Sequence, residues 1–168
     1  MGAAEILRQH VDYAAWASRR IADAAAQLSA DELARDFGTA DRSVLGTLSH
    51  VFAADSIWLA RIKGEQIALS PTGAAFPLET IRRDWPALHA RMRDWANGLT
   101  DEAVQAPLSY TDMRGNPYQQ PVWQVVLHVV NHGSHHRGQV AGFLRTMGHT
   151  PPALDLIRFY RETQVAVR

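Results

Sequence analysis

Residues 128–138, HVVNHGSHHRG, carry the densest group of chemically active side chains in the sequence. Four of the eight histidines of the chain fall within nine positions there. Imidazole acts as a general acid or base near neutral pH, and in its neutral form it is the commonest metal ligand among the side chains. Spacing along a helix divides these histidines into two pairs with different surroundings.

His132 and His136 belong to an apolar row. Residues three or four apart share one face of a helix. The row consists of Val125, Val129, His132, His136, Val140 and Phe143. We therefore expect both imidazoles to face the core. At this spacing the Cβ atoms are about 5 to 6 Å apart, so both rings can reach one ion. Two buried imidazoles need partners for their polar nitrogens, and a shared metal ion would provide one. The alternative is a pair of core histidines whose nitrogens form hydrogen bonds with the backbone or with other side chains.

A second row on the same segment is polar throughout. It consists of Gln124, His128, Asn131, His135 and Gln139. This pattern predicts that His128 and His135 lie at the border of the helix face or outside it. His128 is rotated by about 40° from His132, close enough to support the metal ligands from behind. Further candidates for that supporting role, with solvated positions as the alternative, are Asn131, Arg137 and Gln139.

The residues around this pair rule out two helical metal motifs. H-E-x-x-H metalloproteases carry a glutamate directly after the first histidine, where this chain has valine after His128 and glycine after His132. Ferritin-like di-iron proteins require Glu-x-x-His pairs on facing helices, a pattern that this sequence does not contain. The pair therefore comes without a general base on its own helix.

A catalytic metal usually has three protein ligands and one open position, so a third histidine is needed. We favour His50, because small side chains leave room for an ion on its helical face. These neighbours are Gly46, Thr47, Ala53 and Ala54. His10 is the reserve, because its neighbours are bulkier. His89 shares a face with two arginines and is expected to be solvated, and His149 follows the predicted end of its helix.

Helical periodicity dominates the chain and predicts the elements that must position these histidines. The predicted long helices cover residues 6–28, 43–63, 81–99 and 121–147. The shorter elements expected are helices at 29–38 and 153–162 and a β-hairpin at 107–120. Pro86 must either kink the third long helix or mark the start of its regular part near Trp85. Residues 65–77 lack periodicity and are predicted to form a loop.

Long amphipathic helices bury their apolar faces most economically against one another. The expected fold is therefore all-α, an antiparallel four-helix bundle with a small β-hairpin before the fourth long helix and a short C-terminal helix. With 168 residues, the chain is expected to form a single domain, residues 1–168, with a substantial core.

The composition excludes several classes of function. Seventeen basic and seventeen acidic residues leave no net charge, so the sequence lacks the positive surface of a nucleic-acid-binding protein. Cysteine is absent, so any reactive thiol must arrive with a ligand. Charged residues near the N-terminus argue against a signal peptide, and no segment has the roughly 20 apolar residues of a membrane span. These features predict a cytoplasmic protein without membrane or nucleic-acid partners.

Three segments resemble the DinB/YfiT-like superfamily of metalloenzymes: YAAWASRRI, LSHVFAADSIWLARIKG and YTDMRGNPYQQPVWQVVLHVVNHGSHHRGQV. The resemblance covers nearly the whole chain, and the last segment is the most specific. It implies an antiparallel four-helix bundle that binds a divalent ion, commonly zinc or nickel, through three histidines. These correspond here to His50, His132 and His136. Some members are S-transferases for low-molecular-weight thiols such as bacillithiol or mycothiol, and others are known as metal-binding dimers.

The first functional hypothesis is a metal-dependent enzyme, an S-transferase or hydrolase, in which the ion activates a thiol or water toward a small-molecule substrate. Tyr13, Trp16 and Trp58 are candidates to line its pocket, although aromatic residues at helical spacing more often belong to the core. The alternative is a non-catalytic, metal-stabilised dimeric module of the stress response. A metal-free interaction bundle is the third possibility. We expect a homodimer in either metal-binding case.

Overall fold

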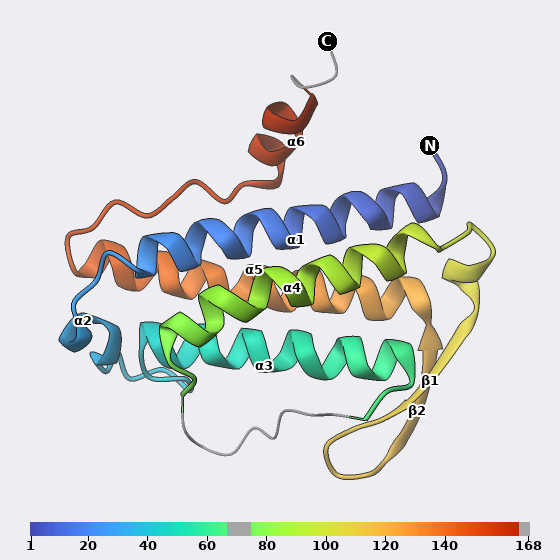
Figure 1. The fold of residues 1–168 in the computed structure, drawn as a ribbon, viewed down its shortest axis with the longest axis horizontal. Helices are drawn as coiled ribbons and strands as arrows, with labels where there is room; N and C mark the ends of the chain where they lie inside the picture. Colours follow the sequence, from blue (N-terminus) through green and yellow to red (C-terminus); the bar gives the residue numbers. More distant parts are fainter. Residues whose placement is uncertain (67–74, 165–168) are drawn as a thin grey trace.

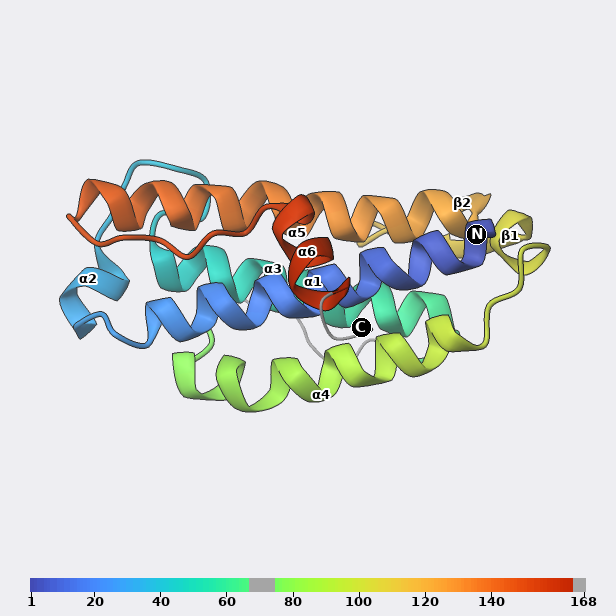
Figure 2. The same ribbon diagram turned by 90° about the horizontal axis from the view of Figure 1, so that it is seen from above.

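The structure is a computed structural model that describes residues 1–66 and 75–164. Four long helices dominate it: α1 (Ala3–Ala25), α3 (Val44–Lys63), α4 (Leu78–Asn97) and α5 (Val122–Thr146). They lie side by side along the longest axis of the molecule (Figures 1 and 2). Helices α1 and α3 each pack against both α4 and α5. The predicted long helices are thus confirmed, and the chain is mostly helical.

The long helices do not simply alternate in direction along the chain (Figure 1). Helices α1 and α5 run one way and α3 and α4 run the other, so the α1–α4 and α3–α5 contacts are antiparallel. The connection between Lys63 and Leu78 allows two successive helices to be parallel. A stretch of about 14 residues can span about 45 Å, longer than the roughly 30 Å of a 20-residue helix such as α3. The predicted loop at 65–77 lies largely outside the described residues.

Local signals fix the ends of α3. The Ser43 hydroxyl accepts a hydrogen bond from the backbone N–H of Gly46 at 3.0 Å and caps the first turn. Gly64 ends the helix in the left-handed conformation, with φ of 65°. Both ends agree with the sequence prediction, and they set the register in which His50 faces α5.

Helix α2 (Ala30–Ala34) is shorter than predicted. It begins with a capping box between Ser29 and Glu32, as its sequence indicates. It ends well before Gly38, because the backbone of Arg35 leaves the helical region with ψ of 126°. The residues after it therefore form an irregular connection to the start of α3.

Helix α4 continues through Pro86, so of the two alternatives for this proline, a regular part that begins only near Trp85 is excluded. Pro86 is exposed, and the carbonyl that loses its helical partner there can bind water instead. The opposite face of the helix is buried. Its buried residues are Ile81, Trp85, Leu88, His89, Met92 and Ala96. Apolar burial on that face offsets the cost of the proline.

A two-stranded antiparallel hairpin, β1 (Pro107–Thr111) and β2 (Pro117–Pro121), precedes α5 as predicted. A 3-10 turn, η1 (Ala103–Gln105), joins α4 to the hairpin. The C-terminal helix α6 (Leu156–Gln164) lies against α1 (Figures 1 and 2). Among the described residues, no helix is long and apolar enough to cross a membrane.

Candidate functional site

Three histidine rings from two helices form one cluster. His50 comes from α3, and His132 and His136 come from successive turns of α5. The Nε2 atoms of His50 and His132 are 3.0 Å apart. One ring nitrogen from each of the three histidines can be chosen so that all lie within 4.8 Å of one another. The structure thus brings together the same histidines that the sequence singled out.

Asp41 lies behind this cluster, in the connection before α3. Its carboxylate oxygens are 3.7 Å from Nδ1 of His50 and 3.5 Å from Nδ1 of His136. A carboxylate at the outer nitrogen favours the tautomer with a proton on Nδ1, which leaves the Nε2 lone pair free. The sequence analysis missed this role, because nothing in the local pattern shows that an irregular connection folds back onto two helices.

Gly46 allows Asp41 to take this position. A Cβ atom at residue 46 would overlap the backbone carbonyl oxygen of Asp41. From its sequence position, the missing side chain of Gly46 is expected to leave room for an ion beside His50. The structure corrects this: the space is filled by the backbone of the connection that carries Asp41.

Gln139 holds the third ring. Nδ1 of His136 donates a hydrogen bond to Oε1 of Gln139, one turn further along α5, at 2.8 Å. This bond also leaves Nε2 of His136 unprotonated, so it can act as a ligand atom. Gln139 was one of the candidates for supporting the ligands, and the structure places it against His136.

The cluster lies at an open face of the molecule. The His50 side chain is 42% exposed and that of His136 is 12% exposed. His132 is half-buried, so the expectation that His132 and His136 face a closed core holds only in part. A cavity of about 630 Å³ adjoins His50, and its wall includes Asp41, Ser49 and Phe76. Small-molecule sites commonly occupy about 300 to 1,000 Å³.

The surroundings of the two α5 rings, His132 and His136, keep them neutral. Burial, reinforced by the neighbouring rings of His136 and His50, lowers the pKa of His132 to about 4. Burial also lowers the pKa of His136, against the opposing effect of its hydrogen bond to Gln139. A neutral imidazole has a lone pair to donate, whereas a protonated one repels a cation. Both α5 histidines are therefore ready to bind a cation near neutral pH.

The donor set fits a divalent cation. In tetrahedral zinc sites with bonds of about 2.0 to 2.1 Å, neighbouring ligand atoms are about 3.3 to 3.4 Å apart. The 3.0 Å contact and the 4.8 Å limit of the cluster lie on either side of that spacing. Small rotations of the rings would bring all three nitrogens to it. Imidazole ligands suit zinc, nickel and copper better than calcium or magnesium, which prefer oxygen.

The other residues considered for this site lie at various distances from it. The ring of His128 is 5.9 Å from that of His132 and 5.1 Å from that of Trp58, so both belong to an aromatic row leading away from the cluster. His135 is exposed and its ring lies 4.9 Å from that of His136. Asn131 is exposed. His128 and His135 therefore lie at the border of the helix face, as the polar row indicated.

Tyr13 and Trp16 belong to a different part of the molecule. The Phe159 ring of α6 packs against both, at centroid distances of 5.9 and 5.7 Å. The Tyr13 hydroxyl donates to the backbone carbonyl of Leu154 at 2.9 Å. The structure thus corrects the expectation that these two residues line the histidine pocket: the C-terminal segment, which packs back onto α1, contacts them instead.

The remaining histidines are engaged elsewhere. His10 interacts with the carbonyl of Ile6 on its own helix through Nδ1 at 2.8 Å, and His149 with Glu32 through Nε2 at 2.7 Å. The expectation that His89 is solvated is wrong, since the residue is only 4% exposed.

Arg137, a further candidate for supporting the ligands, is 2% exposed and lies inside the core. Its Nη1 donates to the Ser18 hydroxyl of α1 at 3.1 Å, and its Nη2 to the Ser134 hydroxyl at 3.2 Å. It therefore links α5 to α1 and is not part of the histidine cluster.

Comparisons with known proteins find relatives over nearly the whole chain. The model of the DinB family matches residues 2–166. Protein DinB of Bacillus subtilis (strain 168) is 24% identical over 167 residues, covering 92% of this chain and 95% of that protein.

Two solved structures share the fold. A DinB-like protein from Bacillus cereus ATCC 10987 superposes with a TM-score of 0.70 at 18% identity, covering 89% of this chain and 95% of that one. The DinB-like protein YjoA from Bacillus subtilis gives a TM-score of 0.64 at 17% identity, covering 88% and 98%. With a family model that matches almost its entire length, the chain belongs to the DinB family.

Proposed function

We propose that His50, His132 and His136 bind one divalent cation, zinc or nickel, and that the protein is a metal-dependent enzyme of the S-transferase or hydrolase class. The observation that carries this proposal is the convergence of three imidazole nitrogens within 4.8 Å of one another, beside a cavity of about 630 Å³. When bound, such an ion lowers the pKa of a water or thiol ligand and polarises a substrate oxygen.

The chain's own residues prepare this chemistry. Asp41 and Gln139 contact the Nδ1 atoms of His50 and His136, so that the Nε2 lone pairs of these rings stay free for a cation. The exposed side of His50 opens toward the cavity, through which a substrate reaches the cluster. Because the chain has no cysteine, a thiol nucleophile must be supplied by a cosubstrate.

The long helices and the assembly of two copies would position this site. We infer that α1, α3, α4 and α5 form a four-helix bundle in a single domain, and that two copies associate as a homodimer. Packing of α1 and α3 against both other long helices supports the bundle.

A turnover assay tests the catalytic part of the proposal. Cysteine and glutathione would be offered with 1-chloro-2,4-dinitrobenzene, where the thiolate displaces chloride, and 4-nitrophenyl acetate would report hydrolysis. We expect turnover of at least one pair, loss after treatment with a chelator, and recovery with added zinc or nickel. Turnover that is indifferent to chelation would overturn metal-dependent catalysis.

A non-catalytic metal-stabilised module is the second candidate function, because the ligands come from two helices and a bound ion would link α3 to α5. In that case metal at 100 times its Kd would stabilise the fold by about 2.7 kcal/mol. The melting temperature would rise with metal, and no turnover would accompany it.

A further inference from the structure

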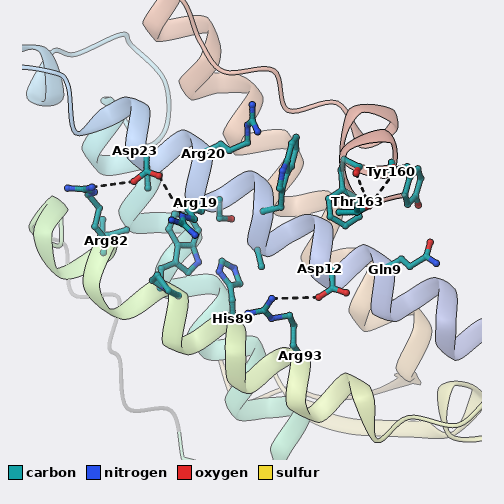
Figure 3. Close-up of a pocket in the computed structure, with 18 residues that line it drawn as sticks. Gln9, Asp12, Arg19, Arg20, Asp23, Arg82, His89, Arg93, Tyr160 and Thr163 are labelled. Carbon is teal, nitrogen blue, oxygen red and sulfur yellow. Dashed lines mark hydrogen bonds and ion pairs between the residues drawn. The ribbon is translucent and has the colours of Figure 1, made fainter. Parts of the chain in front are cut away.

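A second cavity lies on another side of the molecule, between α1, α4 and α6 (Figure 3). Its volume is about 850 Å³, within the range of small-molecule sites. Its described lining residues include none of the three clustered histidines, which lie on α3 and α5. The proposed metal chemistry therefore does not account for it.

Small side chains create the space. Ala15, Ser18 and Ala22 line the cavity from α1, and their spacing of three and four residues places them on one helix face. Larger apolar side chains of α4, Ile81 and Trp85, line the opposite wall. Ser18, Ala22, Ile81 and Trp85 are buried, at 0 to 4% exposure, so the accessible apolar surface of the cavity includes Ala15 and Trp16, which are half-buried.

Aromatic side chains form the end of the cavity next to α6. The rings of Trp16 and Phe159 lie 5.7 Å apart, and both line the cavity together with Tyr160. Trp16 Nε1 donates to Glu162 Oε2 at 3.2 Å, which ties α6 to α1 beside the opening. The cavity therefore depends on the docked position of the C-terminal helix.

Arginine side chains surround the opening. Arg19, Arg20, Arg82 and Arg93 line the cavity, and Arg20 is paired with Glu162 at 3.1 Å. In the described part of the chain, the acidic lining residues are Asp12 and Asp23. Figure 3 shows Arg19 and Arg82 pointing toward the same carboxylate, Asp23, at 3.8 and 3.3 Å.

Arg93 points toward Asp12 at 3.9 Å (Figure 3). Asp23 serves two guanidinium groups, and the contacts of Arg19 and Arg93 are longer than hydrogen bonds, so N–H donors remain at the rim for an anion.

A buried imidazole lies on the α4 wall. His89 lines the cavity, is only 4% exposed, and stacks on Trp85 with ring centroids 5.5 Å apart. Its Nε2 is buried without a hydrogen-bond partner among the described residues, although Asp55 lies 3.3 Å away. In Figure 3 the ring points from α4 toward α1, across the cavity. Its Nε2 faces Asp55 of α3 and is itself buried, so His89 forms part of the floor of the cavity and this nitrogen is not available to a bound molecule.

We propose that this cavity binds a small organic anion with a flat apolar body. The anionic group, a carboxylate, binds one arginine of the α4 rim, Arg82 or Arg93, since a guanidinium group matches the geometry of carboxylate oxygens. The ring system lies against the accessible apolar surface of Ala15, Trp16 and Tyr160. Binding is independent of the histidine cluster.

Calorimetric titration with 2-naphthoate and its neutral analogue 2-naphthamide tests the proposal. We expect naphthoate to bind more tightly than naphthamide by about tenfold or more, the effect of one charge-assisted contact. The double variant Arg82→Gln/Arg93→Gln should lose that preference. Arg91→Gln is the matched control, because Arg91 is exposed on the same helix, pairs with Glu65 and lies outside the cavity. It should bind naphthoate like the wild type.

Two further variants locate the ligand and separate this proposal from the proposed function. Ala15→Phe, which fills the slot from α1, should weaken both compounds by about tenfold or more while the far-ultraviolet circular dichroism stays unchanged. His132→Ala should bind naphthoate normally even if all metal is lost. Equal affinities for the two compounds, or equal losses in Arg91→Gln, would overturn the proposal. So would a dimer that dissociates in the Arg82/Arg93 double variant without any naphthoate binding, because a second copy would then occupy the cavity.

Discussion

Nε2 of His50 and Nε2 of His132 lie 3.0 Å apart, although the two residues are separated by 82 positions in the chain. Such an approach of two basic nitrogens requires something between them, either a shared proton or a cation. The third ring, His136, and the outer partners Asp41 and Gln139 favour a cation, since these partners leave the inner nitrogens unprotonated.

Gln139 should control metal affinity through the orientation of His136. Replacing it by leucine removes the acceptor of the Nδ1 hydrogen bond, so we expect Gln139→Leu to bind zinc about ten times more weakly. Gln139→Glu keeps an acceptor at the same place and should bind zinc at least as well as the wild type. Competition titration with a chromogenic chelator measures both. Equal weakening in the two variants would show that the hydrogen bond has no such role.

Asp41 should also control metal affinity, through the outer nitrogens of His50 and His136. We expect Asp41→Asn to weaken zinc binding about 10- to 100-fold, because the carboxylate no longer favours protonation of the outer nitrogens of His50 and His136. Asp31→Asn, an equal change of charge at an exposed position of α2, should leave the affinity unchanged. If the two variants bound zinc equally well, the carboxylate would not be supporting the ligands.

The stability of the metal-free protein should depend on pH through His132. Its pKa is about 4 in the folded state, whereas an unfolded histidine titrates at about 6.5. Because the folded pKa is depressed, the stabilising contribution is present above about pH 6.5 and is lost as the pH falls toward 4. Urea unfolding in chelator should therefore show a free energy of unfolding that falls over this window. The fall should be shallower in His132→Gln, and identical pH profiles would contradict the assignment.

Asp55 should stabilise the core by partnering a tryptophan. Its Oδ2 accepts a hydrogen bond from Nε1 of the buried Trp85 at 2.8 Å. Asp55→Leu leaves that donor unsatisfied, so we expect the free energy of unfolding to fall by about 1 to 3 kcal/mol. Asp55→Asn retains a side-chain oxygen and should lose less. Urea titrations of both variants at pH 7 measure the difference, and an unchanged Asp55→Leu protein would exclude this role.

Much of the fold follows from local patterns. The apolar rows with a period of 3.6 residues predict the four long helices, and the predicted range 43–63 agrees with the observed ends of α3. The directions of the helices could not be obtained this way. The directions depend on the distance that the connection between α3 and α4 spans, and hydrophobic periodicity contains no information on that distance.

The residues of the histidine site likewise fall into a part that the sequence predicts and a part that it does not. His132 and His136 share a row, and the small residues around His50 pointed to it, so side-chain spacing was enough to choose all three. Asp41 was missed because it reaches the cluster through an irregular connection. Trp16 was placed near the wrong site because nothing local shows that α6 packs onto α1.

His89 shows the limit of arguments from helix faces. It shares its face with Arg82 and Arg93, and a row of charged residues normally indicates solvent. The arginines extend their guanidinium groups to the rim of a cavity, while the shorter imidazole stays beneath them, buried against Trp85. Long charged side chains can therefore cover a buried residue on the same face.

The metal content of the purified protein tests the central claim most directly. After dialysis against zinc and then against metal-free buffer, we expect about one zinc per chain in the wild type and in His10→Ala. His50→Ala, His132→Ala and His136→Ala should each retain less than about a tenth of that amount. A wild-type protein that retains no metal, or variants that retain as much as the wild type, would contradict the account.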